Sequence, residues 1–401
     1  MKTKVLTNVE EAAEILRKGG LVAVPTETVY GLAGNGLVPE TIEKIYEVKG
    51  RPAIKPISLM VPGKEAIPML CEEIPPAAVK LAEAFWPGPI TLIMKAKPEV
   101  PEILRAGGDT VGLRCPRQEQ TLNLLHTVDF PLAVPSANPS GYESAKTAQQ
   151  VLNYFDGKIE AVIDGGACDI GFESTVLDMS KTPYQIVRQG ALEKEKIEDV
   201  LVEAIQLVGI TGGSGCGKTS ALDVFRRNGA LVIDADALYH ELLEENRALQ
   251  DDLAEAFPAA VEDGKLNRRK LGPIVFSDPA ALKRLNAISH RHIGIAIWER
   301  LRSYAMEGGS LAVLDAIELF GQGTQNLRFD LTIAITAPMD TRLARIMQRD
   351  GISEDEARKR LLAQHPQEYF MERCDISVQN DGDRETFKNT IQTILEERLH
   401  G

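Results

Sequence analysis

One stretch decides the fold of the second half of the chain, and it reads Gly212-Gly213-Ser214-Gly215-Cys216-Gly217-Lys218-Thr219. It fits the pattern G-x-x-x-x-G-K-T in full, follows an expected buried strand at Leu207–Thr211 and precedes an expected helix at Thr219–Arg227. Phosphate-binding loops require this order of strand, loop and helix. Glycines let backbone N–H groups turn inward around phosphate oxygens, and the helix N-terminus adds partial positive charge. The stretch therefore predicts a parallel α/β sheet with a nucleotide site at its carboxyl edge.

The loop supplies the candidate nucleotide-binding residues of this half. Lys218 is expected to reach the β- and γ-phosphates of ATP, and the Thr219 hydroxyl to help hold Mg²⁺. The other candidates belong to the loop or follow it directly: Gly213, Ser214, Gly215, Cys216, Gly217 and Ser220.

Two aspartates end the next expected strand, which reads Leu231-Val232-Ile233-Asp234-Ala235-Asp236. Side chains alternate along a strand, so Asp234 and Asp236 are expected to share one face at the carboxyl end of the sheet, where such sheets bind ligands. A carboxylate there can accept the proton of an attacking hydroxyl or hold the waters of a metal ion. The alternative is a pair of capping aspartates before a helix at Ala237–Leu243.

The bulk composition fits a globular protein of two domains. The chain has 401 residues, of which 44% are hydrophobic and 26% charged, and domains of about 100–200 residues predict two of them. A charged amphipathic segment at Leu192–Ala204 runs directly into the strand at Leu207–Thr211, so we place the boundary at residues 203–206 and the domains at 1–204 and 205–401. The net charge of −13 argues against direct RNA binding.

Cysteine usage and hydropathy indicate the compartment. The five cysteines form no C-x-x-C pair and no Cys/His cluster, so reduced thiols fit better than zinc or disulfides. No run approaches about 18 apolar residues, and the first residues lack a signal-peptide pattern. We expect a cytoplasmic protein that does not associate with membranes.

The first half alternates short helices and strands irregularly, which predicts a further α/β unit. Helices are expected at Val9–Lys18 and Pro39–Val48, and strands at Leu21–Val24, Ile90–Met94, Val111–Leu113, Leu132–Val134, Ala161–Ile163 and Ser174–Leu177.

Cations and hydrogen-bonding groups gather at strand ends and loops of this half. The cations are Lys49, Arg51, Lys55, Arg114 and Arg188, and the neutral groups are Ser136, Asn138, Ser144 and Ser174. Ligands of α/β proteins bind at such loops, and cations with hydroxyl donors suit a triphosphate. Taken singly, each Lys or Arg fits an ordinary surface position better; the ordered set predicts an anion site. No general base stands out.

The second half resembles the dephospho-CoA kinase family over about residues 207–400. After T-G-G-x-G-x-G-K-T come I-D-A-D with His240, Leu266-Asn267-Arg268, Val275-Phe276, Arg345-Ile-Met-Gln-Arg349-Asp, Gln364 and Asn380-Asp-Gly382. The resemblance implies a P-loop kinase, with a parallel sheet flanked by helices, that transfers the γ-phosphoryl group of ATP to the 3′-hydroxyl of dephospho-CoA. It makes Lys218 and Asp236 catalytic, with Asp236 as the base, and places Arg345, Arg349 and Asn380 at the nucleotide.

The first half resembles the YrdC-type threonylcarbamoyl-AMP synthase family over about residues 5–200. The shared motifs are P-T-E-T-V-Y-G-L from Pro25, K-x-R-P from Lys49, F-W-P-G-P from Phe85, R-C-P from Arg114, P-S-A-N-x-S-G from Pro135, E-S-T-V from Glu173 and R-x-G from Arg188. The family implies a twisted open α/β sheet with a concave cleft. It also implies synthesis of threonylcarbamoyl-adenylate from L-threonine, bicarbonate and Mg·ATP, and transfer of that product to a tRNA-modifying complex.

Position by position, this resemblance implies catalytic roles for Lys49 and Arg51 and threonine contacts from Thr28, Arg114 and Ser174. The nucleotide contacts that it implies come from Arg51, Lys55, Thr110, Ser136, Asn138, Ser144 and Arg188.

Three positions depart from the families and keep rivals open. Met60 lies in a segment where many synthases carry His; Arg291 stands where the kinases usually have Pro, and Gly321 where they often have Glu. One rival makes the first half an RNA-binding module without synthase activity. A second gives the kinase another nucleoside-like acceptor. A third makes the kinase half a degenerate scaffold, against which the intact Lys218 and Asp236 argue.

Overall fold

The computed structural model describes residues 2–262, 265–321 and 323–399, and the chain divides into two units. The first unit comprises Met1–Ala204 with Met306–Gly308, and the second comprises Ile205–Ala305 with Gly309–Gly401. Within the described ranges, no helix is long and apolar enough to cross a membrane.

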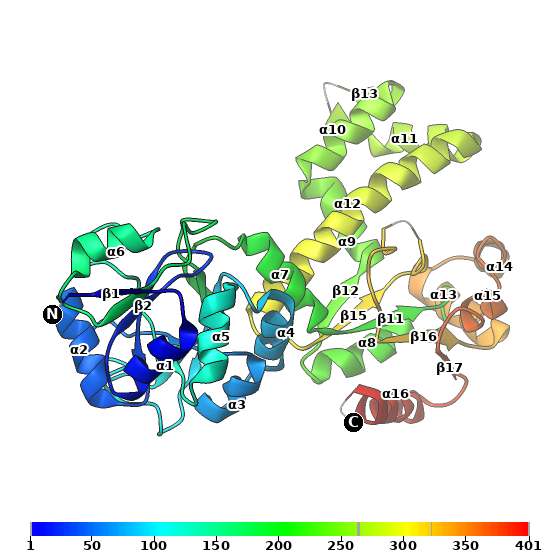
Figure 1. Ribbon diagram of the computed structural model, residues 1–401. Helices are drawn as coiled ribbons and strands as arrows, with labels where there is room; N and C mark the ends of the chain where they lie inside the picture. Colours follow the sequence, from blue (N-terminus) through cyan, green and yellow to red (C-terminus); the bar gives the residue numbers. More distant parts are fainter. Residues whose placement is uncertain (1, 263–264, 322, 400–401) are drawn as a thin grey trace. The chain divides into compact units, whose positions relative to one another are not determined.

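The first unit is built on a ten-stranded mixed sheet in the order β1-β8-β2-β3-β7-β4-β6-β5-β9-β10 (Figure 1). Its strands are β1 (Lys4–Leu6), β2 (Val22–Val24), β3 (Gly31–Asn35), β4 (Leu59–Met60), β5 (Ile90–Lys95), β6 (Thr110–Arg114), β7 (Leu132–Ala133), β8 (Ala161–Ile163), β9 (Thr175–Asp178) and β10 (Gln185–Arg188). Its helices are α1 (Val9–Arg17), α2 (Pro39–Lys49), η1 (Lys64–Ala66), α3 (Ile67–Leu70), α4 (Pro76–Phe85), α5 (Glu119–Thr127), α6 (Ala148–Phe155) and α7 (Lys194–Glu203).

Strand pairing in this unit brings distant segments to one end of the sheet. β4 and β6 are parallel, with Met60 opposite Arg114. β5 is antiparallel to β6 and parallel to β9, with Ile90 opposite Thr175. The end of β6 and the starts of β5 and β9 therefore meet. Behind them, α1 and α5 pack on a core that includes Leu16 and Leu124.

The second unit contains a five-stranded sheet in the order β12-β15-β11-β16-β17, in which all neighbours are parallel. Its strands are β11 (Gln206–Thr211), β12 (Leu231–Asp234), β15 (Leu311–Asp315), β16 (Leu331–Thr336) and β17 (Ile376–Gln379), with a separate hairpin of β13 (Val261–Glu262) and β14 (Lys265–Leu266). Its helices are α8 (Lys218–Arg227), α9 (Ala235–Glu245), α10 (Arg247–Ala256), η2 (Pro258–Ala260), α11 (Arg268–Ser277), α12 (Pro279–Met306), α13 (Met339–Asp350), α14 (Glu354–Leu362), α15 (Gln367–Met371) and α16 (Arg384–Leu399).

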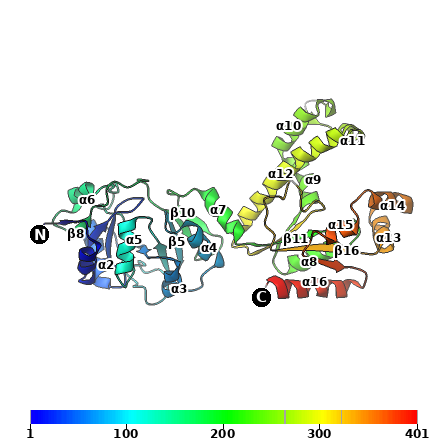
Figure 2. The ribbon, with the colours of Figure 1, turned by 45° about the vertical axis from the view of Figure 1, so that its right-hand side comes forward.

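Two helices cover one face of the parallel sheet. In both ribbon views α8 and α16 lie together below it, while α10 and α11 stand away from it at the start of α12 (Figures 1 and 2). Phe225 of α8 and Ile391 of α16 are fully buried with the strand residues Val313 and Ile333. This packing orients α8, so that its N-terminus lies at the carboxyl edge of the sheet.

The structure confirms the predicted fold classes and most predicted elements. The helices expected at Val9–Lys18 and Thr219–Arg227 are α1 and α8, shifted by one residue at one end. The strand expected at Ala161–Ile163 is β8 without change.

One local prediction is wrong. Asp234 ends β12, but Asp236 lies in the first turn of α9 rather than beside Asp234 on a strand face. The reason is capping: the Asp234 carboxylate accepts the backbone N–H groups of Asp236 and Ala237, both at 3.0 Å, so the helix begins at Ala235. Asp234 is thus the capping residue that the alternative described.

Candidate active sites

A cavity in the first unit gathers residues from seven separate stretches of the chain. Its lining includes three guanidinium groups, from Arg51 after α2, Arg114 at the end of β6 and Arg188 at the end of β10. Ser136, in the loop after β7, and Ser174, directly before β9, add hydroxyl groups to the wall. The structure therefore brings together five of the residues that the sequence nominated.

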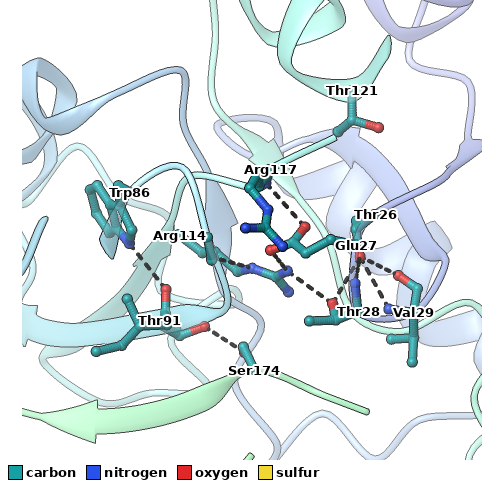
Figure 3. A network of polar contacts seen from close by, with 12 residues as sticks. Thr26, Glu27, Thr28, Val29, Trp86, Thr91, Arg114, Arg117, Thr121 and Ser174 are labelled. Atoms are coloured by element: carbon teal, nitrogen blue, oxygen red, sulfur yellow. Dashed lines mark hydrogen bonds and ion pairs between the residues drawn. The ribbon is translucent and has the colours of Figure 1, made fainter. Parts of the chain in front are cut away.

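Arg114 lies in a buried network that Figure 3 shows from close by. Its Nη2 donates to Glu27 Oε1 at 2.8 Å and to Thr28 Oγ1 at 2.9 Å. The ion-paired side chains of Arg114 and Glu27 are 8% and 0% exposed. Glu27 Oε2 accepts the backbone N–H of Arg117 at 3.0 Å. Thr28, nominated as a substrate residue, is therefore held against the arginine.

Glu27 was missed as a site residue. It stands inside the quoted motif that begins at Pro25, and a charged residue in an otherwise apolar and hydroxyl-rich stretch signals a buried partner. The sequence could not identify that partner, because Arg114 lies 87 residues further on.

Ser174 and Arg188 form a second contact group on the cavity wall. Arg188 donates through Nε and Nη2 to the Ser174 carbonyl oxygen at 3.1 and 2.9 Å. The Ser174 hydroxyl lies 2.9 Å from Thr91 Oγ1, which belongs to β5. Burial lowers the pKa of Arg188, and Glu173 on the cavity wall opposes that shift.

Lys49 is buried at the end of a helix instead of lying at a strand end or in a loop, as the sequence suggested. It is the last residue of α2, and its ammonium group donates to the carbonyl oxygens of Ser136 and Asn138. Burial lowers the pKa of Lys49 to about 7, and the charge of Arg51 acts in the same direction. Lys49 therefore orders the loop that carries Ser136 and does not face the cavity itself.

Asn138 and Ser144 lie behind the wall. The Asn138 amide nitrogen donates to the Pro139 and Tyr142 carbonyls, while its Oδ1 is buried and accepts no hydrogen bond within the described part of the chain. Ser144 donates to Glu173 Oε1 at 2.8 Å.

Of three further positions singled out in the sequence, only Met60 lines the cavity. Lys55 is exposed, and its carbonyl oxygen accepts Arg51 Nε at 3.2 Å and the Tyr46 hydroxyl at 2.9 Å. Thr110 pairs with Lys95 at the opposite end of β6 from Arg114, so the structure does not bring it to the wall. Met60 lines the cavity, and its thioether makes that part of the wall apolar.

In the second unit the Gly-rich loop has the conformation that its glycines permit. Gly212, Gly215 and Gly217 have φ values of 141°, 77° and 96°. Gly217 is the N-cap of α8, and a Cβ atom there would stand 2.1 Å from Asn380 Nδ2. Glycine is therefore required at this position for both its backbone angle and its lack of a side chain.

Side chains from later elements hold the loop in place. Gln364 receives the Ser214 N–H at 2.8 Å and donates to the Ser214 hydroxyl at 2.6 Å. Asn380 donates to the Cys216 carbonyl at 2.9 Å, and Arg345 donates to the Gly215 carbonyl at 3.2 Å. Arg342, which the sequence did not nominate, is buried and donates to the Ser214 carbonyl at 2.9 Å.

Lys218 faces a carboxylate that sequence reasoning also missed. Its Nζ donates to the Gly212 carbonyl at 3.0 Å and lies 3.7 Å from Asp315 Oδ1. Asp315 ends β15, and its Oδ1 accepts no hydrogen bond among the described residues. Burial raises the pKa of Asp315 to about 7, which the Lys218 ammonium opposes. The signal was an apolar run that ends in a single acid, Leu311–Asp315.

Asp236 opens onto a second, mainly apolar cavity beside the loop. Its lining includes Tyr239 and Phe276 as well as the polar His290 and Glu318.

The two departures from the kinase pattern, Arg291 and Gly321, and also Arg349 make none of the loop contacts described above. Arg291 pairs with Asp252, and Gly321 donates its N–H to the Glu318 carbonyl at 2.9 Å. The guanidinium of Arg349 pairs with Asp350 at 2.7 Å, so the structure does not bring it to the loop.

Comparisons with known proteins match each half separately. The Sua5/YciO/YrdC family model, described as telomere recombination, matches residues 14–190, and the dephospho-CoA kinase model matches residues 206–386. The threonylcarbamoyl-AMP synthases of Pyrococcus abyssi and Bacillus subtilis are 45% and 40% identical to this chain over 192 and 195 residues. Each match covers 48% of this chain and 56% of the relative, so the chain spans about half the length of these curated synthases.

The second half matches complete kinases. The dephospho-CoA kinase of Anaeromyxobacter dehalogenans is 36% identical over 193 residues, which cover 48% of this chain and 91% of that protein. Both resemblances found in the sequence are thereby confirmed. The chain joins a domain of the Sua5/YciO/YrdC family to a second domain that belongs to the dephospho-CoA kinase family.

Proposed function

We propose that the chain is a bifunctional enzyme with domains 1–204 and 205–401, and that the first synthesises threonylcarbamoyl-adenylate from L-threonine, bicarbonate and ATP. The observation that carries this is the gathering of Arg51, Arg114 and Arg188 with two serine hydroxyls on one cavity. Arg51 and Arg188 would hold the triphosphate, since guanidinium groups bind phosphate through paired N–H donors. Arg114 would take the carboxylate of threonine.

In this proposal the first domain works by positioning and by charge. The carbamate oxygen of carboxylated threonine attacks the α-phosphorus, and the bond to the pyrophosphate oxygen breaks. Negative charge grows on the phosphoryl oxygens and on the leaving pyrophosphate, where fixed guanidinium groups stabilise it best. Lys49 would contribute by ordering the loop of Ser136 and Asn138.

The second domain would transfer the γ-phosphoryl group of ATP to the 3′-hydroxyl of dephospho-CoA. Lys218 and the N–H groups of the loop would hold the phosphates, as such loops do. Asp236 would accept the proton of the attacking hydroxyl from its place on the acceptor cavity. Arg345 already contacts the loop and would reach the phosphates with little movement.

The donor set of the second domain fits Mg²⁺, which prefers oxygen ligands and keeps several waters. Thr219 at the start of α8 supplies such an oxygen, as does Asp315 Oδ1, which accepts no hydrogen bond in the described part of the chain. Among the described residues, no group of three or more His, Cys, Asp or Glu side chains could hold a metal alone. Phosphate oxygens would therefore complete the site, and the ion would neutralise phosphate charge.

The product of the first domain is an activated adenylate, so we propose a tRNA-modifying complex as its recipient. The net charge of −13 disfavours direct RNA binding by this chain. Steep salt-dependent tRNA binding without ATP turnover would instead favour the RNA-binding module.

One reaction tests both assignments. The full chain would receive Mg·ATP, L-threonine, bicarbonate and dephospho-CoA, with products identified by mass spectrometry. Arg51→Ala is expected to lower adenylate formation by about 100-fold or more and to leave coenzyme A formation intact. Lys218→Ala is expected to do the reverse. If coenzyme A does not form and a parallel screen shows that nucleosides are phosphorylated, then the acceptor is a nucleoside and not dephospho-CoA.

A further inference from the structure

Glu27 is the most deeply buried charge beside the first cavity, and nothing in the proposed chemistry uses it directly. The residue is 1% exposed and lies in the turn between β2 and β3. Both carboxylate oxygens are occupied: one by Arg114 Nη2 at 2.8 Å, the other by the Arg117 N–H at 3.0 Å (Figure 3). An ion pair withdrawn from water to this extent persists only when its geometry is well satisfied.

The contacts fix the Arg114 guanidinium from more than one side. Nη2 is shared between the Glu27 carboxylate and the Thr28 hydroxyl, and Nε points to the Gly88 carbonyl at 3.4 Å. Thr28 is itself held, because its hydroxyl lies 2.8 Å from Thr26 Oγ1. Since a guanidinium carries five N–H donors in one plane, these contacts leave donors for the cavity that Arg114 lines.

The three cavity arginines therefore differ in charge environment. Arg51 donates to the Pro56 carbonyl and Arg188 to the Ser174 carbonyl, so both hydrogen-bond to neutral groups, and the Glu173 carboxylate on the cavity wall acts on Arg188 only through its nearby charge. Arg114 shares its charge with a carboxylate. Its end of the cavity suits a group with one negative charge on a zwitterion, whereas the end of Arg51 and Arg188 suits a polyanion.

We infer that Glu27 is a positioning residue for the amino-acid end of this cavity, which it serves by aiming and partly neutralising Arg114. The inference rests on the proposed synthase function of the domain. Loss of the carboxylate would let the Arg114 guanidinium rotate toward other acceptors. A misplacement of about 1 Å at such a group costs on the order of 100-fold in rate or affinity.

The test is steady-state kinetics of adenylate formation by the full chain carrying Glu27→Gln. The KM for L-threonine is expected to rise by about 10-fold or more, while the KM for ATP stays within about twofold of wild type. Glu27→Asp keeps the negative charge but shortens the side chain by one methylene group. Its KM for L-threonine is therefore expected to lie between the values for the wild type and Glu27→Gln. Coenzyme A formation by the same molecules reports the amount of folded chain.

Thr121→Val is the matched control. The Thr121 hydroxyl is buried in the same region and donates to the Pro25 carbonyl at 2.5 Å, without touching Arg114. It is expected to lower thermal stability without a selective change in the KM for L-threonine.

Equal changes in the KM values for L-threonine and ATP, or an unchanged KM for L-threonine in a folded Glu27→Gln chain, would overturn the inference. If Glu27→Gln fails to fold, Glu27→Asp replaces it in the test, and a wild-type KM for L-threonine in Glu27→Asp would also overturn the inference. Wild-type chain that makes no adenylate and does not bind L-threonine by calorimetry would overturn the proposed function itself.

Discussion

Single residues in both sites carry charges that are buried and held by partners far away in the chain. Asp315 is the clearest case, since it is 9% exposed and 3.7 Å from the ammonium group of Lys218. A buried carboxylate with an unpartnered oxygen costs stability unless something binds it. Asp315 lies at the end of β15, 3.7 Å from Lys218 of the loop, so under the proposed function we expect a bound nucleotide with Mg²⁺ to compensate this cost.

Substitution of Asp315 tests that role. Asp315→Asn keeps the shape and removes the negative charge, so coenzyme A formation is expected to fall by about 10- to 100-fold, with a higher Mg²⁺ requirement. The measurement is initial rate against Mg²⁺ concentration, with adenylate formation as the internal standard. Asp330→Asn is the control, because Asp330 accepts the Leu207 N–H at 2.8 Å at the opposite end of β11. Equal effects of the two substitutions would contradict a role at the loop.

At the residue scale the sequence predicted the groups that lie in local patterns. The loop from Gly212 to Thr219 and the cations Arg51, Arg114 and Arg188 each stand in a motif or at an expected strand end. Glu27 and Asp315 were missed because their roles depend on partners 87 and 97 positions away, which only the sheet brings together. Lys49 was placed wrongly because a cation at the end of a helix resembles a surface residue until its burial is known.

At the scale of elements, capping and side-chain bonds decide where strands and helices begin. β17 is joined to β16 by a reciprocal contact at its start. Asp375 Oδ2 accepts the N–H and the hydroxyl of Thr332 at 2.8 and 2.6 Å, and Thr332 Oγ1 accepts the Asp375 N–H at 2.9 Å. Hydrogen bonds from Thr332 lower the pKa of Asp375 below its ordinary value.

This contact predicts a pH dependence of stability in the second unit. A carboxylate whose pKa is depressed in the folded state stabilises the folded state at pH values above its unfolded pKa of about 3.9. That stabilisation is lost as the pH falls through the folded-state pKa. Asp375→Asn is therefore expected to lower the free energy of unfolding at pH 7 and to flatten its decline below about pH 4. Urea unfolding followed by Trp298 fluorescence in a Trp86→Phe background at several pH values measures this. Parallel pH profiles for the two chains would show that Asp375 does not contribute.

Most elements were predictable because their apolar pattern is regular, as in β8 and α1. The missed strands are short or poor in strand-forming residues: β3 reads Gly-Leu-Ala-Gly-Asn and β4 has two residues. Such strands form because their neighbours offer hydrogen bonds, and propensity alone does not reveal them. The start of α9 was misplaced because a capping aspartate and a strand aspartate look alike in sequence.

On the scale of the whole molecule, each of the two large sheets packs against a core cluster of its own unit among the described residues, and a smaller cluster that includes Leu343 and Leu361 lies in the second unit. The core of the first unit includes Leu16 and Leu124, and that of the second includes Phe225 and Ile391. Each core is built from residues of its own unit, and each unit has its own cavity beside a sheet end. Sequence motifs predicted both architectures because each half contains an ordered series of them.

Separate cores predict that the units unfold in separate steps. Ile391→Ala removes a fully buried side chain between α16 and α8, which is expected to cost about 2–5 kcal/mol of the second unit's stability. Calorimetry of the full chain should then show one transition at lower temperature and the other unchanged, and Leu16→Ala should shift the transition that Ile391→Ala leaves in place. In a Trp298→Phe background, Trp86 remains as the reporter of the first unit and should follow only the Leu16→Ala change. A common shift of both transitions by either substitution would mean that the two units unfold as one cooperative structure, and that a substitution in one active site cannot be assumed silent in the other.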